Sequence, residues 1–205
     1  SAASDVYKRQ VQKIENGGIL TLSEDGIYKI SAYTYGIDGN RSMANSLIVK
    51  IEKDVEKEYK VEHYKEKLDG SYELAETENF KGITRSKVIA NAKEYIGFTE
   101  DKNNSQRIAE GIVARDGSLT LKLYYTRRND LNYTVYYKEQ GTENKLADAK
   151  VVDGKTFGDV VTENAIDIDG YNKVNPTSAE ITITTGKNEY TFYYTKRADL
   201  SYTVY

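Results

Sequence analysis

The C-terminal half of the chain contains short segments in which hydrophobic and polar residues alternate. In the segment "YTVYY", Tyr133, Val135 and Tyr137 occupy every second position. A period of two places such side chains on one face of a β-strand. The segments "AEITIT" (179–184) and "NEYTFYYT" (188–195) alternate in the same way. The pattern therefore predicts strands with one buried face.

Hydrophobic residues at helical spacing predict one helix in each half of the chain. In "TFGDVVTENAI", Thr156 and Asp159 are spaced as in a capping box, and Val160 and Val161 fall on one helical face. The corresponding positions in the first half are Val88, Ile89, Ala92 and Tyr95. The predicted order is strand, strand, helix, strand, strand, which is typical of an α+β fold.

The chain repeats itself. "YYTRRNDLNYTVYY" begins at Tyr124 and "YYTKRADLSYTVY" begins at Tyr193, so that Leu131 and Leu200 are equivalent positions 69 residues apart. The interiors also match, because "LAETENFKGITRSKV" from Leu74 aligns with "LADAKVVDGKTFGDV". Such self-similarity indicates tandem units. The predicted units are 55–130, here named the first module, 131–199, named the second module, and 200–205, the start of a truncated third module.

Residues 1–54 differ from the repeats. The segment "SAASDVYKRQ" (1–10) has no apolar stretch of a signal peptide and resembles the translated adapter of a transposase-based sequencing library. We therefore expect residues 1–10 to be a non-native segment. Residues 11–54 read as two strands around a turn at Asp38-Gly39-Asn40, where φ > 0 is tolerated. Tyr28 lies where a tyrosine corner would place it.

Composition and charge exclude several classes of function. The chain has 205 residues and a net charge of −3, so no basic field attracts nucleic acid or anionic lipid. No apolar run is long enough for membrane insertion of this segment. Cysteine is absent, which excludes disulfides, thiolate nucleophiles and cysteine metal sites.

The residue inventory also argues against an enzyme. His63 is the single histidine, and the repeat aligns it with Tyr137, so we expect a half-buried side chain with satisfied hydrogen bonds. No "GxSxG" motif is present. "DIDG" at Asp167 lacks the 12-residue ligand pattern of a calcium loop and is expected to be a turn. The sequence therefore predicts no catalytic residue, no metal and no cofactor.

Tyrosines are the one residue type with potential to contact a ligand. The chain has 19 tyrosines and no tryptophan. The strand pattern places Tyr125, Tyr190 and Tyr194 in the core, and places Tyr124, Tyr136 and Tyr193 on the opposite face. Exposed aromatic rings can stack on sugar rings. The alternative is cross-strand pairing on a solvated sheet, which the absence of tryptophan favours.

The joints between modules carry two matching charged pairs. Arg128 precedes Asp130, and Arg197 precedes Asp199, with neither Gly nor Pro between them. In an extended strand each pair lies on one face. We expect Leu131 and Leu200 to point the other way and to pack into the module junctions, which would hold the modules in line.

The order of elements, the tyrosine-rich first strand, the internal "GK" turn, the "DIDGYN" step and the closing "YYT" resemble the MucBP repeat family. This resemblance implies ubiquitin-like β-grasp modules of a Gram-positive surface adhesin. It also implies an extracellular, cell wall-associated location and a mucin glycan or host glycoprotein as partner, with no catalytic residues. Residues 11–54 resemble the end of a truncated all-β bacterial Ig-like domain. The chain is expected to be monomeric. The alternative function is a passive stalk or spacer that projects a distal domain.

Overall fold

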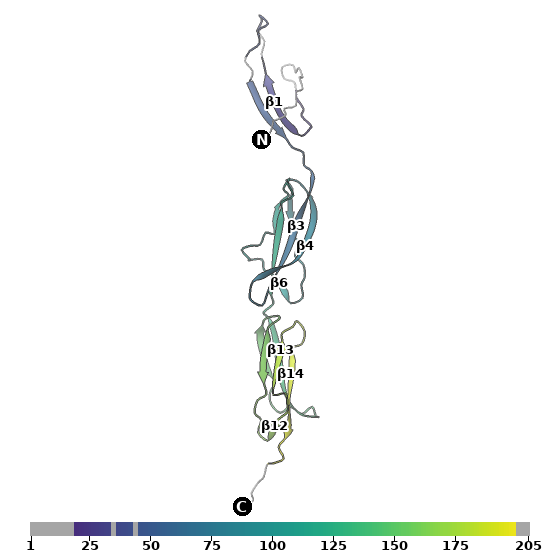
Figure 1. The fold of residues 1–205 in the computed structure, drawn as a ribbon, viewed down its shortest axis with the longest axis vertical. Helices are drawn as coiled ribbons and strands as arrows, with labels where there is room; N and C mark the ends of the chain where they lie inside the picture. The colour runs from purple at the N-terminus through teal and green to yellow at the C-terminus, as the bar shows by residue number, and fades with distance from the viewer. Residues whose placement is uncertain (1–18, 34–35, 43–44, 200–205) are drawn as a thin grey trace, which may run out of the picture.

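The computed structural model describes residues 19–33, 36–42 and 45–199. Three groups of strands follow one another along the long axis of the molecule, from the strand pair near the N-terminus to the second module at the C-terminal end (Figure 1). The expectations for residues 1–10, for the third module at 200–205 and for Leu200 lie outside the described residues.

The two strands predicted near the N-terminus are present. Strands β1 (Gly26–Ala32) and β2 (Asn45–Ile51) form an antiparallel pair. Gly39 lies in the connecting turn with φ of 78°, a conformation that favours glycine. The Tyr28 hydroxyl donates a hydrogen bond of 2.9 Å to the carbonyl oxygen of Glu24. This bond ties β1 to the bend before it, as the tyrosine-corner pattern predicts.

The first module consists of a four-stranded sheet and a separate strand pair. The sheet has the order β4-β3-β8-β6, and its central strands β3 and β8 are parallel. The pair joins β5 and β7. The strands span Glu56–Glu66 (β3), Tyr72–Ile83 (β4), Lys87–Ile89 (β5), Phe98–Glu100 (β6), Glu110–Ile112 (β7) and Thr120–Arg127 (β8).

The second module repeats this arrangement. Its sheet has the order β10-β9-β14-β12, with β9 and β14 parallel, and its strand pair joins β11 and β13. The strands span Leu131–Glu139 (β9), Lys150–Lys155 (β10), Val160–Asn164 (β11), Tyr171–Lys173 (β12), Ser178–Thr182 (β13) and Glu189–Lys196 (β14). Tyr137 pairs with Phe192 here, as His63 pairs with Leu123 in the first module.

The prediction of an α+β fold with β-grasp modules is wrong. The described residues are all-β and contain no helix. The segment expected to form the second helix contributes β11, in which Val161 pairs with Ile181, and Gly158 before it has φ of 84°. The valines and threonine of "VVT" favour strands because β-branched side chains lose rotamer freedom in a helix. The segment expected to be the first helix begins with β5 instead.

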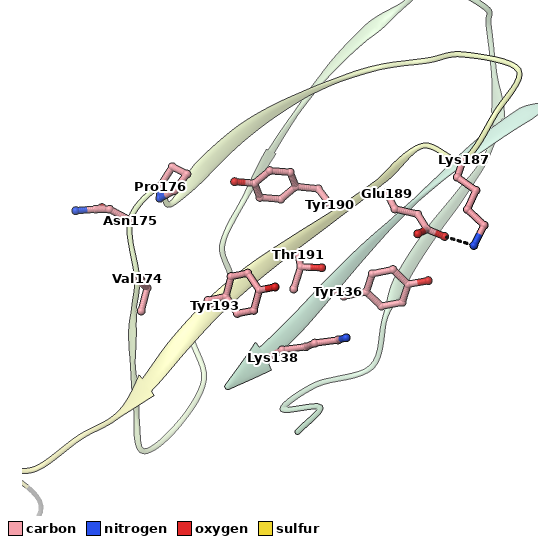
Figure 2. Close-up of a pocket in the computed structure, with 10 residues that line it drawn as sticks. All are labelled: Tyr136, Lys138, Val174, Asn175, Pro176, Lys187, Glu189, Tyr190, Thr191 and Tyr193. Carbon is pink, nitrogen blue, oxygen red and sulfur yellow. Dashed lines mark ion pairs between the residues drawn. The ribbon is translucent and has the colours of Figure 1, made fainter. Parts of the chain in front are cut away.

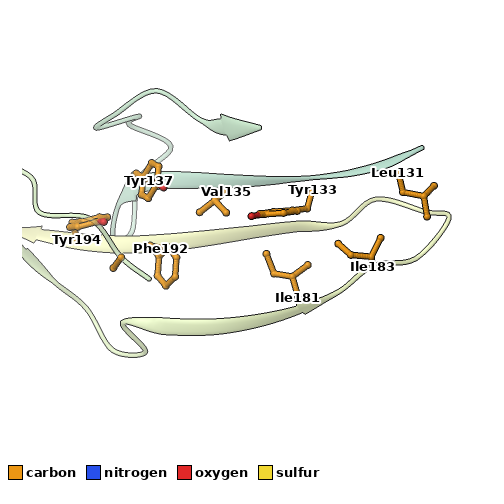
Figure 3. Packing of buried hydrophobic residues seen from close by; sticks show 9 residues of the cluster. Leu131, Tyr133, Val135, Tyr137, Ile181, Ile183, Phe192 and Tyr194 are labelled. Atoms are coloured by element: carbon orange, nitrogen blue, oxygen red, sulfur yellow. The ribbon is translucent and has the colours of Figure 1, made fainter. Parts of the chain in front are cut away.

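The alternating positions form the cores, as the pattern predicts. In the second module, β9 and β14 contribute their inward faces, and β13 and the residue after it cover them (Figure 3). The buried cluster comprises Leu131, Tyr133, Val135, Tyr137, Ala165, Ile181, Ile183, Phe192 and Tyr194. In the first module Leu121, Leu123 and Tyr125 of β8 are at most 1% exposed. Burial of such side chains is the main stabilising contribution to each module.

Candidate functional site

A hollow lies on the outer face of the second module's sheet, on the side away from the core. It has a volume of about 840 Å³ and is open to solvent. In the parallel register of β9 and β14, Tyr136 lies beside Thr191, and Lys138 lies beside Tyr193 (Figure 2). The residues that line it are Tyr136, Lys138, Val174, Asn175, Pro176, Lys187, Glu189, Tyr190, Thr191 and Tyr193.

One wall of the hollow is the segment after β12. The amide of Val174 donates a hydrogen bond of 2.9 Å to the carbonyl oxygen of Tyr193, which holds this segment beside β14. Tyr190 was expected in the core. It packs against the core cluster while only partly buried, with its ring 4.9 Å from that of Phe192, and it also lines the hollow. Tyr193 is 44% exposed. The hollow therefore presents tyrosine rings beside polar groups.

The two lysines of the hollow have carboxylate partners. The Nζ atom of Lys138 lies 2.6 Å from a carboxylate oxygen of Glu143, and Lys187 lies 3.9 Å from Glu189. The hydrogen bond with Glu143 raises the pKa of Lys138 above its ordinary value. Because each lysine faces a carboxylate, the hollow holds little net charge. Such a surface suits an uncharged ligand with hydroxyl groups and apolar C–H faces.

The equivalent face of the first module is closed. Tyr124 occupies the position of Tyr193, but it is only 4% exposed, so its predicted exposure is wrong. The Tyr64 ring stacks on Tyr124 at 4.9 Å, and the Tyr72 ring contacts it edge-on at 5.1 Å. A hydrogen bond to Glu62 raises the pKa of Tyr64 to about 12. Tyr72 comes from the hairpin "KEKLDGSYE", which is longer in the first module than in the second, and this difference is the sequence signal that could have indicated the cover.

His63 lies in a hydrogen-bonded network of the first module's core. It is fully buried, more than the half-buried state expected, and its Nδ1 and Nε2 atoms each lie 2.9 Å from a partner, Tyr125 Oη and Glu78 Oε2. The Tyr125 hydroxyl also accepts the backbone N–H of Lys93 at 2.9 Å. Both ring nitrogens are therefore satisfied inside the core. Among the residues that the structure describes, no group of three His, Asp or Glu side chains could hold a metal ion.

The predicted junction residues have different roles. Arg128 forms two hydrogen bonds with Asp130, of 2.9 and 2.7 Å. Arg197 and Asp199 repeat this geometry at 3.0 and 2.7 Å. These ion pairs are exposed, so each contributes little stability. Leu131 is buried in the second module's core cluster, and Phe157 packs against the same cluster.

Other residues make the junction between the modules. The Phe157 ring contacts Phe98 at 5.7 Å between centroids and lies against Gly97. Arg127 Nη1 donates to Asp159 Oδ1 at 2.7 Å and to the Phe157 carbonyl oxygen at 3.0 Å. Sequence reasoning missed Phe157 because it was assigned to a helix.

The described residues contain no helix of the length and apolar character needed to cross a membrane.

No protein-family model matches this chain, and no curated protein matches it. The search of solved structures finds mucus-binding repeats. The type 2 repeat of the mucus binding protein MUB from Lactobacillus reuteri is 14% identical, with 69% of this chain and 100% of that chain covered and a TM-score of 0.26. A crystal structure of Mub-RV is 13% identical, with 69% and 99% covered and the same TM-score.

Proposed function

We propose that this chain is a non-enzymatic, extracellular repeat segment of a bacterial surface adhesin, and that its second module binds a glycan. The open hollow with Tyr136 and Tyr193 on the outer face of the sheet is the observation that carries this proposal. Tyrosine rings offer apolar faces for sugar C–H groups, while Thr191 and Asn175 offer hydrogen-bond partners.

The proposal includes a division of the chain. Residues 55–130 and 131–199 are successive repeats, and residues 11–54 are the end of an Ig-like domain. The matching strand order and parallel register of the two modules support this division. Attachment to a cell wall and a Gram-positive source belong to the same proposal. The ligands to test first are mucus glycans, because one of the similar solved structures is a repeat of a mucus binding protein.

A glycan array probed with the full chain tests the proposal. We expect binding to mucin-type glycans that is lost in Tyr136→Ala and in Tyr193→Ala. Tyr33→Ala is the matched control, because Tyr33 is 41% exposed but lies outside the hollow. Equal binding by all three variants would exclude the hollow as the site.

The second candidate function is a passive stalk. The contact between Phe157 and the end of the first module favours it, since such a contact restricts bending between the modules. Absence of binding to every mucin glycan, with the chain folded, would favour the stalk over the adhesive module.

A further inference from the structure

The end of the first module is shaped to receive an aromatic ring. A Cβ atom built on Gly97 would lie 2.5 Å from ring atoms of Phe157, so only glycine lets the ring approach this closely. Gly97 has φ of 81°, and its carbonyl oxygen accepts the amide of Arg128 at 2.9 Å. Phe98 flanks the ring from β6. Gly97, its aromatic neighbour Phe98 and the adjoining strand end together form what we call the receiving surface.

A cation beside this surface completes the contact. Phe98 pairs with Arg127 across β6 and β8. The Arg127 side chain is 13% exposed, and its guanidinium binds the Asp159 carboxylate of the second module. The incoming module therefore contributes an aromatic ring and, two residues later, a carboxylate.

The far end of the second module repeats the receiving surface. Gly170 has φ of 79°, and its carbonyl oxygen accepts the amide of Arg197 at 2.9 Å, as Gly97 accepts that of Arg128. Tyr171 follows Gly170 as Phe98 follows Gly97. Tyr171 pairs with Lys196, which places a cation where the first end has Arg127. The Lys196 side chain is 71% exposed.

We propose that this end of the second module is a docking surface for a following module of the same type, one that carries the sequence Phe-Gly-Asp at the positions of residues 157–159. Its aromatic ring would lie on Gly170 against Tyr171, and its carboxylate would pair with Lys196. This occupant follows from the chemistry of the existing junction, where the Phe157 ring contacts Phe98 and the Asp159 carboxylate binds Arg127.

A module of the first type does not fit this surface. The Thr84 amide donates to the Val55 carbonyl oxygen at 2.8 Å, as the Phe157 amide donates to that of Arg128 at 2.7 Å. Thr84 therefore occupies the position of Phe157, one residue away from the sequence alignment, which pairs Thr84 with Thr156. Thr84 is 1% exposed and carries no ring. Arg85 follows it and binds Asp54. Ser86, two residues after Thr84, takes the position of Asp159 and carries no charge to pair with Lys196. The surface therefore selects the second type of module.

The test is a chain in which residues 131–199 are followed by a second copy of residues 131–199. The chain has no cysteine, so spin labels can be attached at cysteines introduced at exposed Thr162 and at the copy's equivalent threonine. Labels at Thr77 and Thr162 report the existing junction for reference. We expect the appended copy to give a distance distribution about as narrow as the reference. Appending residues 55–130 in place of this copy should give a distance distribution that is about twofold broader or more.

Exchanging the charges of Lys196 and the copy's Asp159 tests the same contact in variants whose modules stay folded. Lys196→Glu alone should broaden the distribution, because it places a carboxylate opposite the copy's Asp159. Combining Lys196→Glu with Asp159→Lys in the copy should restore the narrow distribution. Circular dichroism of each variant shows that the modules stay folded. A distribution equally broad with either appended module, or unaffected by the charge exchange, would overturn the proposal.

Discussion

The variant Gly97→Ala tests whether Phe157 is held against the first module in solution. An alanine at φ of 81° costs about 1–2 kcal/mol, because its Cβ approaches the following carbonyl oxygen. The new Cβ would also lie 2.5 Å from the Phe157 ring, which must move. Forcing extra carbon into a packed contact costs about 1–3 kcal/mol. The sum predicts a loss of about 2–5 kcal/mol in the free energy of unfolding.

Gly70→Ala separates the two effects. Gly70 lies in the same module with φ of 79°, and nothing lies within 4 Å of a Cβ built on it. This variant should therefore lose only the backbone contribution of about 1–2 kcal/mol. The difference between the variants, about 1–3 kcal/mol, belongs to the ring contact.

Urea unfolding followed by circular dichroism measures both variants. In addition, Gly97→Ala should broaden the distance distribution between labels at Thr77 and Thr162, whereas Gly70→Ala should leave it unchanged. Equal losses of stability in the two variants, together with an unchanged distribution, would refute the reasoning and leave the modules joined only by their linker.

Two further predictions concern the first module, and one of them compares Tyr124 with its equivalent in the second module. Tyr124→Ala should cost about 3–5 kcal/mol in urea unfolding, because its ring is buried, whereas Tyr193→Ala at the exposed equivalent position should cost about 0.5 kcal/mol or less. Similar costs would show that the two faces do not differ in solution. The hydrogen bond from Lys93, with a smaller contribution from His63, lowers the pKa of Glu78 below its ordinary 4.5 in the folded state. The stability that this carboxylate contributes is present above about pH 4.5 and is lost as the pH falls through the folded-state pKa. Thermal unfolding across the acid range should therefore show a weaker pH dependence in Glu78→Gln, but not in Glu73→Gln, an exposed position on the same strand. An unchanged pH dependence in Glu78→Gln would argue against this role.

Several features followed from local sequence alone. The alternation in "YTVYY" and "NEYTFYYT" identified two strands and their inward residues, because the side-chain period of a strand is two. The repeat also aligned His63 with Tyr137, and the sheet register confirms this equivalence. The turn at Gly39 and the hydrogen bond of Tyr28 were likewise predicted, since both depend on residues close in the chain.

Other features depended on partners distant in the chain. Val160 and Val161 fit a helix by spacing, but their backbones pair with β13, and this long-range pairing decides the conformation. Tyr124 and Tyr193 lie in nearly identical phrases, yet one is buried and the other exposed, because Tyr72 covers only the first. Phe157 gains its role from Gly97, 60 positions earlier in the chain. A sequence pattern fixes which face of a strand a side chain occupies, while only the tertiary structure decides what covers that face.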